Sequence, residues 1–115
     1  MRLGTTAQIL GGYIYKLVSG VQISGGATIW TPSAGKTIRL LGFVLEGDAA
    51  VLIQLCDNAV GTPIFNVPNL LANNIPAVAG IGNGLKLAAA NNVLVAHTSA
   101  GGACLLYGTV WGVEE

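Results

Sequence analysis

Charged residues are scarce in this chain of 115 residues. Only 10 are Lys, Arg, Asp or Glu, five of each sign, so the formal net charge is zero and the charged share is 9%, against about 25% in an average soluble domain. The basic residues are scattered along the chain and are Arg2, Lys16, Lys36, Arg39 and Lys86. A nucleic-acid-binding surface needs clustered Lys and Arg to replace the counterions of the phosphate backbone. We therefore expect no nucleic-acid partner.

Long apolar runs are also missing. No run approaches the roughly 18 apolar residues that a membrane-spanning helix needs, and residues 1–16 break their apolar stretch with Thr, Gln and Gly. We expect no signal peptide and no membrane partner. Synthesis in a cytoplasm is then expected, where Cys56 and Cys104 would stay thiols.

Residues that commonly carry chemistry are few. His97 is the sole histidine and has no acidic or Cys neighbour in the sequence, so a half-buried strand position is favoured over a base or a ligand. The two cysteines lack the spacing of a zinc site and are interpreted as small buried hydrophobic residues. Residues 33–37 resemble the end of a phosphate-binding loop, but Trp30 stands where that loop needs its first Gly. We expect no catalytic residue, no cofactor and no metal, and we expect Glu114 and Glu115 to end the chain in solvent.

Apolar residues, at 52%, and 17 glycines dominate what is present. A folded monomer of this mass exposes roughly 5,800 Å², which leaves about one charge for each 600 Å² of surface. A neutral and weakly charged surface associates readily. We expect a subunit of a permanent assembly, with much of its surface buried in contacts with neighbouring subunits.

Short apolar runs bounded by Gly, Pro and Asn predict an all-β domain. The expected strands are 28–31, 36–46, 51–57, 62–67, 77–81, 85–89, 93–99 and 103–113, with a connection at 68–76 and a turn at 100–102. About eight short strands predict an antiparallel jelly-roll β-sandwich, with an immunoglobulin-like sandwich as the alternative. Asn83-Gly84 predicts a two-residue type I′ hairpin turn between two of these strands.

Residues 27–56 are expected to form the centre of the fold. The strand 36–46 is apolar on both faces, with Ile38, Leu40, Gly42 and Val44 on one side and Thr37, Arg39, Leu41, Phe43 and Leu45 on the other. The strand 51–57 is expected to return beside it. A strand with two apolar faces must be covered twice, once by the second sheet and once by a further segment or another subunit.

The segment 1–26 is expected to be an extended N-terminal arm or edge strand that carries attachment, while 27–115 forms the sandwich. Assembly contacts are expected from large apolar side chains, and the candidates are Tyr13, Tyr15, Trp30, Leu41, Phe43 and Trp111. An alternative use of the aromatic residues, with Tyr107 among them, is a sugar-binding platform.

Three motifs resemble a known family. They are Ala34-Gly35-Lys36-Thr37-Ile38-Arg39-Leu40, then Gly84-Leu85 with Asn92-Val93-Leu94, and finally 102–110 with Tyr107. Over about 31–113 the chain looks like the small jelly-roll virion structural proteins of tailed bacteriophages, which include capsid decoration proteins and head fibres. The polar turn 57–63 departs from the family, because it is longer than the turn expected at this place.

This resemblance implies a non-enzymatic capsid decoration, or cement, protein. Such a protein forms a homotrimer on the phage head, contacts the major capsid protein and stabilises the shell, so its expected location is the capsid surface of the virion. The alternative is a receptor- or glycan-binding tip domain of a phage fibre.

Overall fold

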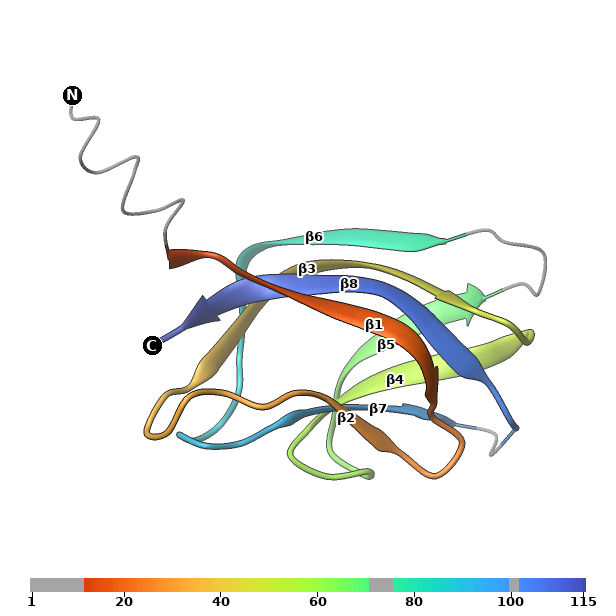
Figure 1. The fold of residues 1–115 in the computed structure, drawn as a ribbon, viewed down its shortest axis with the longest axis horizontal. Helices are drawn as coiled ribbons and strands as arrows, with labels where there is room; N and C mark the ends of the chain where they lie inside the picture. The colour runs from red at the N-terminus through yellow and green to blue at the C-terminus, as the bar shows by residue number, and fades with distance from the viewer. Residues whose placement is uncertain (1–11, 71–75, 100–101) are drawn as a thin grey trace.

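In the part of the chain that the structure describes, eight strands form two packed antiparallel sheets (Figure 1). A computed structural model describes residues 12–70, 76–99 and 102–115. The strands are β1 (Ile14–Gln22), β2 (Ala27–Trp30), β3 (Ile38–Gly47), β4 (Val51–Asp57), β5 (Pro63–Leu70), β6 (Ala77–Lys86), β7 (Leu94–Thr98) and β8 (Leu105–Glu114). The first sheet has the order β1-β8-β3-β6 and the second has the order β2-β7-β4-β5. The all-β, eight-stranded sandwich expected from the sequence is confirmed.

The core lies between the two sheets. In β3 the predicted alternation is interrupted by an irregularity between Leu40 and Gly42. Phe43 and Leu45 therefore lie on the same side as Ile38 and Leu40, and the expectation that they lie on the opposite side is wrong. Ile38, Leu40, Phe43 and Leu45 of β3 face Ile53 and Leu55 of β4, and all six are buried. Phe43 of the first sheet also meets Phe65 of the second edge to face, with ring centroids 5.2 Å apart. β3 and β4 are central in their sheets, as expected for the centre of the fold.

β4 does not pair with β3, so the expectation that 51–57 returns beside 36–46 is wrong. β3 lies between β8 and β6, whereas β4 lies between β7 and β5. The chain crosses from one sheet to the other after Gly47, and the two strands face each other across the core. Alternation in a sequence indicates which side chains share a side of a strand, but not which strand lies next to it.

The hairpin predicted at Asn83-Gly84 is also wrong, because β6 runs as one strand from Ala77 to Lys86. β6 pairs with β3 at both ends, Leu85 with Leu40 and Gly80 with Gly42, and residues 81–84 bulge opposite Leu41 alone. A type I′ turn needs positive φ at both central residues. Gly84 has φ 88°, but Asn83 is not among the residues with positive φ.

β5 continues past Val67, where the sequence predicted it to end, as far as Leu70. It lies at the edge of the second sheet, and edge strands are where proline is tolerated within sheets. Residues 71–75 of the predicted connection, and 100–101 of the predicted turn, lie outside the described residues.

Part of the expected N-terminal arm belongs to the sandwich. β1 is an edge strand that pairs with β8 from Ile14 to Gln22, and both Val18 and Ile23 are buried in the core. Residues 1–11 lie outside the described residues.

A candidate interaction face on the first sheet

The outer side of the first sheet is covered mainly by apolar and aromatic residues. We call this surface the aromatic face and define it by Tyr15 and Leu17 of β1, Tyr107, Thr109, Trp111 and Val113 of β8, Leu41, Gly42 and Val44 of β3, and Val78 and Gly80 of β6. Alternation places most of these residues opposite the inward-facing core positions of the same strands. In β3 the irregularity between Leu40 and Gly42 brings Leu41 and Gly42 to the same side.

Strand register arranges the aromatic face in rows across the sheet. One row contains Tyr15, Trp111, Gly42 and Gly80, which are successive partners in β1, β8, β3 and β6. The next row contains Leu17, Thr109, Val44 and Val78. Cross-strand neighbours on one side of a sheet are close enough to contact, so each row is a continuous strip over all four strands.

Two aromatic rings lie across glycines of neighbouring strands. A Cβ at Gly42 of β3 would be 2.5 Å from Cζ2 of Trp111, so the indole occupies the space of the missing side chain. The ring of Tyr107 similarly approaches Gly20 of β1, at 3.5 Å from an ideal Cβ position. Tyr15 lies next to Trp111, with ring centroids 6.3 Å apart. Rings placed in this way broaden the apolar surface of the sheet.

Large apolar side chains on this face are open to solvent. Leu17 is 79% exposed, Val78 68%, Tyr15 64% and Tyr107 43%. Single exposed apolar residues are ordinary, but these four lie on one side of one sheet, and contiguous apolar patches mark binding surfaces.

The outer side of the second sheet is more polar. Gln54 of β4 donates through Nε2 to Oδ1 of Asn66 on β5, 3.0 Å away. His97 is the partner of Gln54 on β7, and Thr28 of β2 is exposed. The two outer sides of the sandwich are therefore chemically different.

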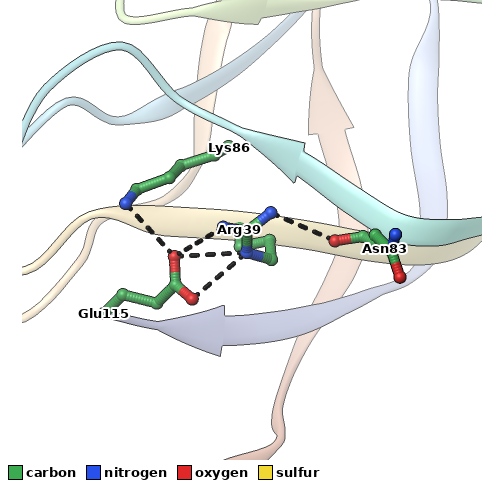
Figure 2. Close-up of polar contacts among 4 residues, drawn as sticks. All are labelled: Arg39, Asn83, Lys86 and Glu115. Atoms are coloured by element: carbon green, nitrogen blue, oxygen red, sulfur yellow. Dashed lines mark hydrogen bonds and ion pairs between the residues drawn. The ribbon is translucent and has the colours of Figure 1, made fainter.

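Positive charge and one carboxylate gather at one end of the aromatic face (Figure 2). Arg39 Nη2 is 3.1 Å from Oε1 of Glu115, and Lys86 Nζ is 3.4 Å from the same oxygen. Arg39 also donates through Nη1 to the carbonyl oxygen of Asn83 at 3.1 Å. Hydrogen bonds from Arg39, together with the charges of Arg39 and Lys86, lower the pKa of Glu115.

Glu46 lies at the opposite end, in the row of Ser19 and Tyr107. Its Oε1 is buried and has no hydrogen-bond partner among the described residues. A buried carboxylate oxygen without a partner is costly, so this end of the face gains from an added cation or donor.

The structure separates the six candidates for assembly contacts. Tyr15, Leu41 and Trp111 belong to the aromatic face, and Tyr13 is half-buried just before β1. Trp30 and Phe43 are instead core residues, 1% exposed each. The expectation that Trp30 and Phe43 make assembly contacts is therefore wrong, because size alone does not reveal the side of a strand on which a residue lies.

The aromatic face also contains residues that the sequence did not single out as contacts, Leu17, Val44 and Val78. Alternation over 14–22 and 77–81 would have placed Leu17 and Val78 on this side, given the knowledge that these segments are strands of one sheet. Alternation could not have placed Val44, because the irregularity between Leu40 and Gly42 shifts the pattern in β3.

The sequence predicts that Glu114 lies in solvent, and this prediction is wrong because the residue is half-buried. It accepts a hydrogen bond from Nε1 of Trp30 at 2.9 Å and one from the backbone N–H of Ser33 at 3.0 Å, and so links β8 to β2 across the sandwich. Burial acts to raise the pKa of Glu114, but these hydrogen bonds outweigh it and the pKa is lowered.

Cys56 and Cys104 are buried free thiols, as expected, and desolvation raises the pKa of each. His97 is half-buried on β7, as expected, with Nδ1 3.1 Å from the carbonyl oxygen of Thr98. Residues 12–70, 76–99 and 102–115 hold no group of three His, Cys, Asp or Glu that could bind a metal ion. Within the same ranges, no helix has the length and apolar character needed to cross a membrane.

Comparisons with protein-family models, with curated proteins and with solved structures give no match. A function is therefore inferred from the aromatic face and from the resemblance of the motifs in 31–113.

Proposed function

We propose that the chain is a structural protein of a tailed-bacteriophage virion, and that it acts by binding other proteins. In this proposal it decorates the capsid, contacts the major capsid protein and further copies of itself, and stabilises the shell.

The aromatic face is the observation that carries this proposal. A chain with only 9% charged residues leaves Leu17, Val78 and Tyr15 mostly exposed on one sheet. Burying apolar surface contributes roughly 25 cal/mol for each Å² removed from water. A surface of this kind is stable in solution mainly when another protein covers it.

The strand order supports the jelly-roll assignment that accompanies this function. The pairs β1–β8, β2–β7, β3–β6 and β4–β5 are all neighbours, so the chain runs out through β1 to β4 and returns through β5 to β8 beside its own first half. A jelly roll combines eight strands in two Greek keys, whereas the constant-type immunoglobulin sandwich has seven strands in sheets of four and three. The former agrees better with two sheets of four.

Localisation on the particle tests the proposal. Antibodies raised against the purified chain are bound to virions of the phage that encodes it and imaged by electron microscopy. We expect regularly spaced label over the head. Virions that carry no label, although a known capsid protein is labelled in the same preparation, would refute the proposed function.

One observation favours a second candidate, the glycan-binding fibre tip. The exposed ring of Tyr15 and the ring of Trp111 lie side by side, tilted by 32°, and adjacent aromatic rings offer stacking surfaces to a ligand. A glycan array distinguishes the two candidates. Specific binding that is lost in Trp111→Ala, together with label at fibre tips, would favour this alternative.

A further inference from the structure

We propose that the aromatic face binds the same face of a second copy of this chain, with the strands of the two sheets running in opposite directions across the contact. The inference rests on the proposed function in one respect, that the chain is an assembly protein, and it names the partner and the geometry.

The size of the face suits such a contact. Four strands about 4.8 Å apart and about 10 residues long, at about 3.3 Å per residue, span roughly 600 Å² in projection. The relief of the side chains adds to this area. A stable protein–protein interface takes about 800 Å² from each partner, so one sheet face of this size is sufficient.

The charges at the two ends of the face are complementary. One end holds the side chains of Arg39, Lys86 and Glu115, whose side-chain charges sum to one positive charge. The other end holds Glu46, whose Oε1 is buried and unpartnered within the described part of the chain. Opposite charges at the ends of one surface make that surface complementary to a reversed copy of itself.

A two-fold axis satisfies this complementarity twice. If the axis lies in the plane of the contact, crosses the strands and passes between the rows of Trp111 and Thr109, β3 of one copy lies over β3 of the other. The Glu46 end of each copy then meets the Arg39 and Lys86 end of its partner. The apolar rows of Trp111 and Thr109 lie in the middle, where water is excluded, and the charges form the rim.

A two-fold pair fits these features better than the homotrimer that the resemblance implies. A closed trimer uses heterologous contacts, in which the face meets a different surface of the next copy. The outer side of the second sheet offers Gln54, Asn66 and His97, which are polar partners for an apolar surface. Of the two outer sides of the sandwich, the aromatic face of a second copy is therefore the more complementary partner for the aromatic face.

Charge exchange tests the pairing on the full chain. Glu46→Lys alone places like charges at both ends of the pair, and so does Lys86→Glu. Like charges in contact cost several kcal/mol, so each variant alone should dissociate at least about tenfold more readily than the wild type. In a 1:1 mixture both ends become complementary again, and a heterodimer should form with at least the wild-type affinity.

Light scattering and native mass spectrometry measure these species, and circular dichroism checks that each variant folds. Glu46→Gln, which removes the charge and keeps the shape, is the substitute if Glu46→Lys does not fold, and it should weaken the pair to a smaller degree. Variants that pair like the wild type, a mixture that forms no heterodimer, or a wild-type protein that is a monomer or a trimer would each overturn the proposal.

Zero-length cross-linking supplies an independent readout. Within one copy, the rows of Lys86 and Glu46 lie seven β3 residues apart, about 23 Å in an extended strand, which a carbodiimide cannot join. A mixture of ¹⁵N-labelled and unlabelled chains should give Lys86–Glu46 cross-links between copies, and their absence would contradict the pairing.

The pairing and the proposed virion role fail separately. A chain that pairs in solution but whose antibody does not bind virions would refute the virion role alone. A chain that is monomeric in solution but whose antibody binds virions would refute the pairing alone.

Discussion

At Gly42 the space for a side chain is taken by the indole of Trp111. A Cβ there would meet Cζ2 and Cε2 of Trp111 at 2.5 and 2.7 Å and the carbonyl oxygen of Ala79 at 2.7 Å. Gly42→Ala should therefore lower the free energy of unfolding by about 1–3 kcal/mol, the usual cost of overpacking. Gly80→Ala is the matched control, because Gly80 lies in the same row with nothing within 4 Å of its Cβ position. Its effect should stay within about 0.5 kcal/mol. Equal urea midpoints for the two variants would contradict this arrangement.

Glu114 and Glu115 should make the free energy of unfolding depend on pH in the acid range. Burial opposes ionisation of Glu114, but hydrogen bonds from Trp30 and Ser33 lower its pKa, and Arg39 and Lys86 lower the pKa of Glu115. A carboxyl whose pKa is lower in the folded state binds protons more readily when unfolded. Its stabilising contribution is therefore complete above the ordinary pKa of glutamate and is lost as the pH falls through the lowered value.

The double variant Glu114→Gln/Glu115→Gln tests this dependence. We expect it to be less stable than the wild type at neutral pH, and to lose less stability between neutral pH and the acid side of the ordinary glutamate pKa. Urea unfolding at a series of pH values measures both quantities. Parallel stability curves for the two proteins would rule out this role of the two carboxylates.

Among the elements, β1 connects the N-terminal segment to the fold. Val18 is buried, and the strand covers one edge of β8 from Ile14 to Gln22. Removing residues 1–19 should therefore abolish cooperative unfolding or lower the melting temperature strongly, because β8 loses one of its two neighbouring strands and the core loses Val18. The control is Thr28→Ala, which changes an exposed side chain of β2 outside the aromatic face and should leave the melting temperature nearly unchanged. A truncated chain that melts like the wild type would show that β1 is dispensable.

Element boundaries could be predicted well where apolar runs end at clear turn residues. The range of β4, 51–57, agrees in full with the expectation, and β7 and β8 agree to within two residues. The turn predicted in β6 failed because Asn83-Gly84 is a local signal, whereas pairing with β3 on both sides of the bulge is a long-range one. Side-by-side pairing of β3 and β4 failed for the same reason, since sequence neighbours can face each other across a core.

For the whole molecule, the sequence predicted an uncovered apolar side from the two apolar faces of β3, and the aromatic face has that character. The sequence did not predict which aromatic residues lie on it. Trp30 and Phe43 were indistinguishable from Trp111 and Tyr15 until the register was known, because a shift of one residue moves a side chain to the other side of a sheet.

The most direct test of the aromatic face as the contact surface is the molar mass of paired variants in solution. Light scattering on the wild-type chain should give about twice 11.6 kDa, and Leu17→Asp, which adds a charge to the face, should give the monomer mass. Leu52→Asp adds the same charge to an exposed residue of β4 in the second sheet and should keep the wild-type mass. A wild-type chain that remains at 11.6 kDa at every concentration, or a Leu17→Asp variant with the wild-type mass, would contradict this account.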